Sequence, residues 1–195
     1  DVCSSDLLND LQGFSLFLKD GAPCQLNAAW FLRPDERECH ITHLDVTALD
    51  GRRGHHALVP TGRIMPVDSS GHIIRIDMTG RELVRAGIAY STPEDGGRYF
   101  RTNDFVGKPL MARDRDAGTL IDFLVDTFHW DLRYFEVAID AHEVLVDPAW
   151  TNDIDGRRRR IAVDLPHAAI ATAPEFSGTD VMNPGYCESL YRHYT

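Results

Sequence analysis

The sequence has no long hydrophobic run and no closely spaced pair of cysteines. No apolar stretch approaches the roughly 18 residues that cross a bilayer as a helix, and the cysteines form no Cys-x-x-Cys pair. Widely separated cysteines in a chain of 195 residues favour reduced thiols over a disulfide framework. We therefore expect a cytoplasmic protein with free thiols at Cys3, Cys24, Cys39 and Cys187.

The sequence also lacks the short motifs that place catalytic groups. It contains no Gly-x-Ser-x-Gly, no Gly-rich phosphate loop and no Gly-x-Gly-x-x-Gly, so we expect neither an enzyme nor a bound cofactor. Basic residues are few, since 20 Lys and Arg against 30 Asp and Glu give a formal net charge of −10. This balance disfavours nucleic acids and anionic membranes as partners, because both are bound through Lys and Arg.

The chain has no initiator Met, and residues 1–7 match the in-frame translation of a sequencing adapter. We expect that these residues, Cys3 included, are not native. The expectation of a cytoplasmic protein without a membrane-inserted segment therefore concerns the residues from Leu8 onward.

An internal repeat is the strongest positive signal. Residues 9–16 recur as residues 103–110, 94 positions later (103 − 9), with Asp, Gly and the final Leu in register. Residues 74–78 recur as residues 161–165, 87 positions later (161 − 74), so the first copy carries extra residues between its two landmarks. Such self-similarity predicts a duplicated structural unit.

The repeat divides the chain into four segments. We predict a diverged first repeat at residues 8–91, a polar and Gly-rich linker at 92–100, a second repeat at 101–176, and a tail at 177–195 that contains a short helix. In the second repeat, alternating apolar residues at 133–140 predict a half-buried strand. Both repeats are therefore expected to consist mainly of short antiparallel strands.

Helix signals follow the strands. Thr79 and Glu82 form a capping box that predicts a helix at the end of the first repeat. Asn183 followed by Pro predicts the start of a last helix. On that helix Tyr186, Leu190 and Tyr194 recur every four residues and form an apolar stripe.

The second repeat resembles the PRC-barrel family, the small β-barrel of the photosynthetic reaction centre H subunit and of the ribosome maturation factor. Residues 107–110 are similar to the Gly-Lys start of the family, and residues 118–126 to its Gly-x-Ile-x-Asp-x-x-Val-Asp strand. The resemblance implies a mainly β protein of two tandem antiparallel β-barrels, each closed by a short helix, followed by a C-terminal helical tail. It also implies a protein partner, because members of the family act mostly by binding other proteins.

Two carboxylates of the family pattern are candidate site residues. Asp122 and Asp126 lie four apart on a predicted strand, whereas the first repeat has Ala28 and apolar residues there. Such residues typically accept backbone N–H bonds and hold a neighbouring turn. The alternatives are a contact with a partner or with a hard cation, for which two carboxylates are too few ligands.

A second candidate is the group of metal-capable donors at Cys39, His40 and His43. On a strand the two imidazoles would point to opposite faces, and His55 and His56 are the candidates for the further ligands that zinc requires. We therefore predict no metal site here.

The strongest charge run follows a hairpin turn predicted at residues 155–156. It is either a solvated hairpin that protects a sheet edge or, together with Arg52 and Arg53, a patch that faces an anionic partner. The residues of the run are Arg157, Arg158, Arg159 and Arg160.

Taken together, these features predict a non-enzymatic protein-binding or scaffolding module in which the two repeats pair pseudo-symmetrically. Residues 122, 126 and 157–160 are the possible contacts with a partner. One alternative is an accessory of membrane electron transport similar to the H subunit, and another is a metal-dependent enzyme.

Overall fold

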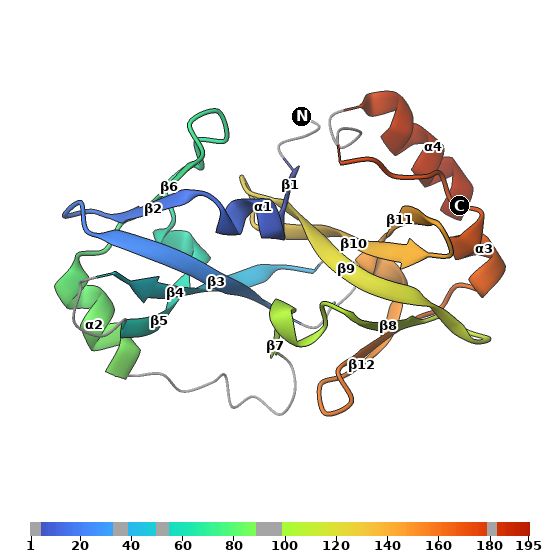
Figure 1. Cartoon of the computed structure of the whole chain (residues 1–195), viewed down its shortest axis with the longest axis horizontal. Helices are drawn as coiled ribbons and strands as arrows, with labels where there is room; N and C mark the ends of the chain where they lie inside the picture. Colours follow the sequence, from blue (N-terminus) through green and yellow to red (C-terminus); the bar gives the residue numbers. More distant parts are fainter. Residues whose placement is uncertain (1–4, 33–38, 50–54, 89–98, 179–182) are drawn as a thin grey trace.

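The computed structural model describes residues 5–32, 39–49, 55–88, 99–178 and 183–195 and is built mainly from two β-sheets (Figure 1). The first sheet has the order β5-β4-β3-β2-β6 and the second the order β11-β10-β9-β8-β13-β12. In the first sheet the strands are β2 (Ser15–Leu18), β3 (Pro23–Leu32), β4 (Ile41–Ala48), β5 (His55–Pro60) and β6 (Ile73–Ile76). In the second they are β8 (Lys108–Met111), β9 (Asp116–Asp126), β10 (Asp131–Ile139), β11 (His142–Val146), β12 (Thr151–Asp155) and β13 (Arg160–Val163).

Short helices connect and cover the sheets. The α-helices are α1 (Leu8–Gln12), α2 (Gly80–Ile88), α3 (His167–Ala171) and α4 (Pro184–Tyr194), and the 3-10 turns are η1 (Thr61–Arg63), η2 (Thr102–Asp104) and η3 (Pro148–Trp150). The predicted capping box is present: the Thr79 N–H donates to Glu82 Oε2 at 2.7 Å, and the Glu82 N–H donates to Thr79 Oγ1 at 3.3 Å. In the second half of the chain, Pro166 takes the N-cap position of α3.

Both halves of the chain repeat one topology in register. Leu16 of β2 pairs in parallel with Ile74 of β6, and Leu110 of β8 pairs in parallel with Ile161 of β13. These positions differ by 94 and 87 residues (110 − 16 and 161 − 74), the displacements seen in the sequence. The antiparallel ladders β3–β4 and β9–β10 also have their two irregularities at equivalent places. The sequence repeat is therefore a structural repeat.

Two short strands cross between the halves. β1 (Ser5–Leu7) pairs with β9 of the second half, and β7 (Tyr99–Arg101) pairs with β3 of the first. Leu7 lies opposite Leu124, and Arg101 lies opposite Trp30. The two strands are equivalent, because Arg101 follows Leu7 by 94 positions (101 − 7) and Leu124 follows Trp30 by the same number (124 − 30). Two residues of the predicted linker thus belong to the first sheet. β1 lies in the adapter-like segment, but backbone pairing requires no particular side chain.

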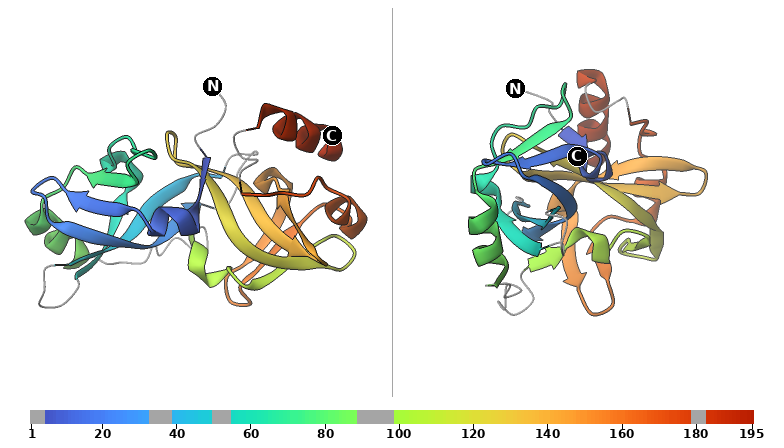
Figure 2. Two further views of the ribbon diagram at one scale, coloured as in Figure 1. Left: turned by 45° about the horizontal axis from the view of Figure 1, so that its top comes forward. Right: turned by 60° about the vertical axis from the view of Figure 1, so that its left-hand side comes forward.

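A single hydrophobic core connects the halves. Phe31 of β3 contacts Phe105 and Phe123, with ring centroids 6.0 and 5.7 Å apart, and one buried cluster contains residues from both sheets. Figure 2 shows the two lobes side by side, with α2 at one end and α4 over the second lobe. Among the described residues no ladder joins β12 to β11 or β6 to β5, so the predicted closure into two barrels is not confirmed.

The C-terminal helix packs on the second sheet. Its N-cap is Asn183, whose side chain accepts the Gly185 N–H at 2.9 Å. Leu190 is 1% exposed and packs with Leu124 and Leu145, and the Tyr194 hydroxyl donates to the Leu145 carbonyl at 3.0 Å. The predicted apolar stripe is thus confirmed as a packing surface.

Candidate functional site at the junction of the two sheets

β4 and β10 begin side by side where the two halves meet. The Ile41 N–H donates to the Trp130 carbonyl, and the Leu132 N–H donates to the Cys39 carbonyl, both at 2.7 Å. These bonds flank a bridge between His40 and Asp131. Leu44 and Phe135 occupy matching places in the equivalent ladders and are 91 positions apart (135 − 44). His40 and Asp131 are also 91 positions apart (131 − 40), so these two residues hold equivalent positions in the two halves. The bridge therefore lies on the pseudo-twofold axis.

The turn between β9 and β10 is held by Asp126. One oxygen, Oδ1, accepts the N–H groups of Phe128 and His129 at 2.9 and 3.2 Å. Trp130 closes the turn in the left-handed region at φ 61°, with its N–H donating to the Asp126 carbonyl at 2.7 Å. Because a bulky residue rarely adopts this conformation, the packing of the 6% exposed Trp130 side chain must hold it there.

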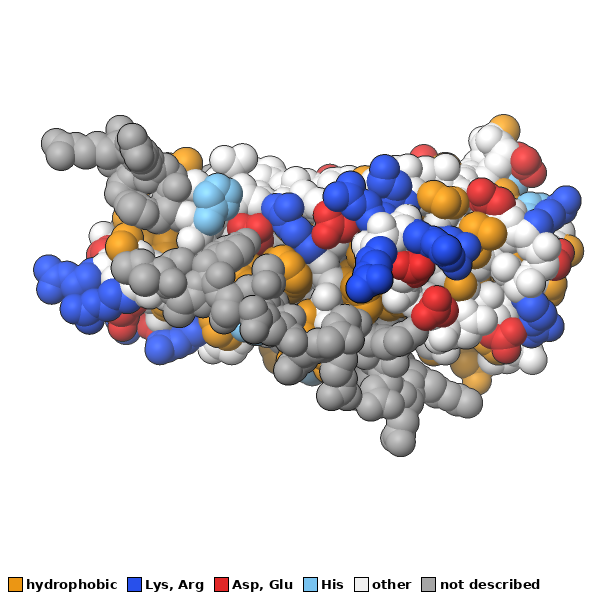
Figure 3. All heavy atoms as spheres, turned by 90° about the horizontal axis from the view of Figure 1, so that it is seen from below, with side chains coloured by type: hydrophobic (Ala, Val, Ile, Leu, Met, Phe, Trp, Pro, Cys, Tyr) orange, Lys and Arg blue, Asp and Glu red, His pale blue; other side chains and the backbone are white. Residues whose placement is uncertain are grey.

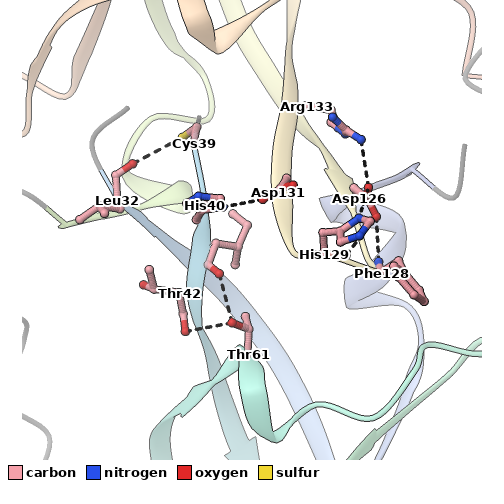
Figure 4. A network of polar contacts seen from close by, with 11 residues as sticks. Leu32, Cys39, His40, Thr42, Thr61, Asp126, Phe128, His129, Asp131 and Arg133 are labelled. Atoms are coloured by element: carbon pink, nitrogen blue, oxygen red, sulfur yellow. Dashed lines mark hydrogen bonds and ion pairs between the residues drawn. The ribbon is translucent and has the colours of Figure 1, made fainter. Parts of the chain in front are cut away.

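His40, Asp126, His129 and Asp131 form a polar group that we call the junction cluster (Figure 4). His129 Nδ1 lies 3.2 Å from Asp126 Oδ2, and His40 Nδ1 lies 2.5 Å from Asp131 Oδ1. Arg133 Nη2 also contacts Asp126 Oδ2 at 3.2 Å. Burial favours the protonated Asp126 carboxyl, but hydrogen bonds from the His129 side chain and the Phe128 N–H outweigh it and keep its pKa below the usual value.

A pocket of about 410 Å³ adjoins the junction cluster. Residues 61, 62 and 64–67 of the first half line one wall, and residues 127–130 of the second half line the other. Two of its lining side chains are exposed and apolar, since Phe128 is 74% and Met65 48% exposed. Thr61 fixes the first wall by donating its hydroxyl to the Ile41 carbonyl at 3.2 Å.

Asp122 lies elsewhere on β9 and has a structural contact. It is 3% exposed and accepts the N–H groups of Asn9 in α1, at 3.2 Å, and of Phe123, at 2.8 Å. Asp122 and Asp126 thus each accept backbone N–H bonds, as their structural interpretation predicts. They hold different segments, and no hydrogen bond among the described residues joins them.

Glu136 lies directly opposite Asp122 on β10 and was not predicted to be buried. Burial, and then the charge of Asp122, raise the pKa of Glu136 to about 7, and burial raises the pKa of Asp122 to about 6. The equivalent residues of the first half are Ala28 and Asp45. In the first half Asp45 has a cationic partner, because Arg101 Nη2 of β7 lies 3.0 Å from Asp45 Oδ2.

The basic run forms the turn between β12 and β13. Asp155 Oδ1 accepts the N–H groups of Arg157 and Arg158, both at 3.0 Å. The first three arginines are exposed and Arg160 is half-buried. Within the described chain their guanidinium groups make one ion pair, from Arg158 to Asp155 at 3.7 Å. Figure 3 shows Lys and Arg side chains gathered on the face where this hairpin projects, with Asp and Glu side chains between them.

The structure does not bring the predicted contact residues together. The strand register places Arg160 of β13 beside Pro109 of β8, and Pro109 pairs with Thr119 of β9. Asp126 lies seven residues beyond Thr119 on β9, which is roughly 23 Å farther along the strand. Arg52 and Arg53, the other half of the predicted patch, lie outside the described residues.

The histidine candidates also separate. His43 pairs with Pro60 at one end of the β4–β5 ladder and His55 pairs with Ala48 at the other, whereas His40 contacts Asp131. Cys24 and Cys39 are buried free thiols, as predicted. The sequence signal that we missed is Asp126-x-x-His129-x-Asp131, three donors within one turn.

Comparison with models of protein families and with curated proteins gives no match to this sequence. Among the described residues, none of the helices combines the length and the hydrophobicity needed to cross a membrane.

Proposed function

We propose that the chain is a non-enzymatic, cytoplasmic protein-binding or scaffolding module, built from two repeats of the PRC-barrel type that pair pseudo-symmetrically. The contact with the partner is the basic turn, which carries the four arginines of residues 157–160. Its charge complements an acidic protein surface.

A comparison of two equivalent turns carries this proposal. In the first half, Asp68 Oδ1 accepts the Gly71 N–H at 2.8 Å, and His72 follows in the left-handed region at φ 52°. In the second half Asp155 is the same acceptor, and Arg159 follows at φ 53°. The fold therefore builds this turn without arginine.

The arginines also contribute little to stability. Exposed ion pairs contribute about 0–1 kcal/mol, and among the described residues only Arg158 of this run forms one, at 3.7 Å. A run of exposed like charges that the fold does not require can attract and steer an oppositely charged partner. The asymmetry between the two turns supports a contact through the second half.

The first test is recovery of a partner from native lysate on immobilised protein, followed by elution with increasing salt. Recovery should fall with ionic strength, because exposed charges are screened within about 10 Å at 0.1 M salt. Replacing Arg158 and Arg160 by Ser should reduce recovery while thermal unfolding is retained. Recovery that does not change with salt or with these substitutions would contradict the proposal.

A further inference from the structure

The junction cluster contains donors that are typical of transition-metal sites. We propose that Asp126, His129 and Asp131 bind one divalent transition-metal ion, with zinc as the best fit, and that His40 is a positioning residue for Asp131. This site is separate from the basic turn and independent of the proposed function.

The spacing of the donor atoms supports the site. One ligand atom from each of Asp126, His129 and Asp131 lies within 4.8 Å of the other two. Zinc bonds of about 2.0–2.2 Å in a tetrahedron place neighbouring ligand atoms roughly 3.4 Å apart. His129 Nδ1 and Asp126 Oδ2 are already 3.2 Å apart. Separations of up to 4.8 Å must therefore close by as much as roughly 1.4 Å, and the exposed His129 imidazole, 62% accessible, is able to move.

The chemistry of the donors selects the kind of ion. An imidazole nitrogen with two carboxylates suits zinc and its neighbours. Calcium takes six to eight oxygen ligands, and this group offers two carboxylates and one imidazole nitrogen. We therefore expect selectivity for zinc over calcium.

The local charge also favours a cation. Two carboxylates face each other across the turn, and the Arg133 guanidinium offsets one of them by its contact with Asp126 Oδ2. Asp126 Oδ1 remains occupied by the backbone N–H groups of the turn, which fixes the orientation of this ligand before the metal binds.

His40 completes the site from the other half of the chain. Its Nδ1 lies 2.5 Å from Asp131 Oδ1, and Figure 4 shows Asp131 between His40 and the Asp126–His129 pair. A hydrogen bond from a neighbouring group orients a metal-binding carboxylate, and its loss typically reduces metal affinity 10–100-fold. Three protein ligands leave a coordination position for water beside the pocket of residues 127–130.

The test is calorimetric titration of zinc chloride into the chelator-treated protein of residues 1–195. We expect one zinc per chain, no heat with calcium chloride, and affinity reduced at least tenfold in His129→Ala and about 10–100-fold in His40→Ala. His72→Ala, which removes an exposed imidazole elsewhere, should bind zinc as the wild type does. No stoichiometric binding, or equal affinity in His129→Ala, would overturn the proposal.

A second measurement requires no variant. Zinc should shift the imidazole NMR signals of His129 and then of His40, while the signal of His72 stays in place. Equal shifts of all exposed histidines would indicate weak surface binding and would overturn the assignment.

Discussion

His40 and Asp131 hold equivalent positions in the two halves of the chain, and their side chains contact each other at 2.5 Å. In a homodimer of one repeat, a residue on the twofold axis would face its own copy. Duplication within one chain removes that constraint, because the two equivalent positions can then carry different residues. Here one position carries an imidazole and the other a carboxylate.

Exchange of His40 and Asp131 tests whether the two side chains interact across the pseudo-twofold axis. In chelator-treated protein, His40→Asp should lower the free energy of unfolding by about 1 kcal/mol, because two carboxylates then face each other at a partly exposed site. The double variant His40→Asp/Asp131→His should recover most of the loss. Chemical denaturation of the wild type, His40→Asp, Asp131→His and the double variant gives the coupling energy, and purely additive effects would show that the two side chains do not interact.

Separation of the halves should be costly, because each sheet contains a strand from the other half. Residues 101–195 alone lack β1, which pairs with β9, and Phe31, which contacts Phe105 and Phe123. We expect this fragment to dimerise or aggregate, as light scattering after size exclusion would show. A stable monomer that unfolds cooperatively would contradict the account.

The C-terminal helix offers a matched pair of substitutions. Leu190→Asp should destabilise the protein by about 3 kcal/mol or more, because it places a carboxylate in an apolar contact with Leu124 and Leu145. Tyr191→Asp, at a neighbouring side chain that is 71% exposed, should change stability by less than about 0.5 kcal/mol. Equal melting temperatures for the two variants would show that α4 does not pack on the sheet.

The pair of buried carboxyls predicts a pH dependence. Glu136 has a pKa of about 7 in the folded protein against 4.5 normally, so the folded state binds the proton more tightly than the unfolded state. Its contribution to stability is therefore complete below about pH 4.5 and is lost as the pH rises to 7, by an amount of the order of 2 kcal/mol.

Glu136→Gln should flatten this part of the pH profile and should be the more stable protein at pH 7.5. Glu175→Gln, at an exposed side chain after α3, is the control and should keep the wild-type slope. The comparison is made by urea denaturation between pH 4.5 and 8. The same slope in the wild type and in Glu136→Gln would show that Glu136 does not titrate in this range.

Local features of the fold were predictable from the sequence. The capping box at Thr79, the turn after Asp155 and the stripe around Leu190 depend on neighbours a few residues away, and all three are present. The strand exchange was not predictable, because a three-residue strand such as β7 has little periodicity and its partner lies about 70 residues earlier in the chain.

The site was harder to predict than the fold. The contact of His40 with Asp131 joins residues 91 positions apart (131 − 40), and only the duplicated topology relates them. Period-two alternation placed Glu136 on the outer face of its strand, but that face also carries Leu124 and Leu145, which α4 covers. Both faces of β10 are therefore buried, and burial of the outer face depends on the C-terminal helix α4.

The most direct test of the central claim exchanges one turn for its equivalent. Arg157→Ser/Arg158→Gly/Arg159→His gives the second half the residues of the first, Ser70, Gly71 and His72. Gly156 is kept, because a Cβ there would lie 3.3 Å from the Phe100 ring. The control Arg75→Ser/Arg81→Ser/Arg85→Ser removes the same charge from exposed positions of the first half. We predict that the turn exchange abolishes recovery of the partner at 0.1 M salt while the control retains it, and equal recovery by both variants would contradict the account.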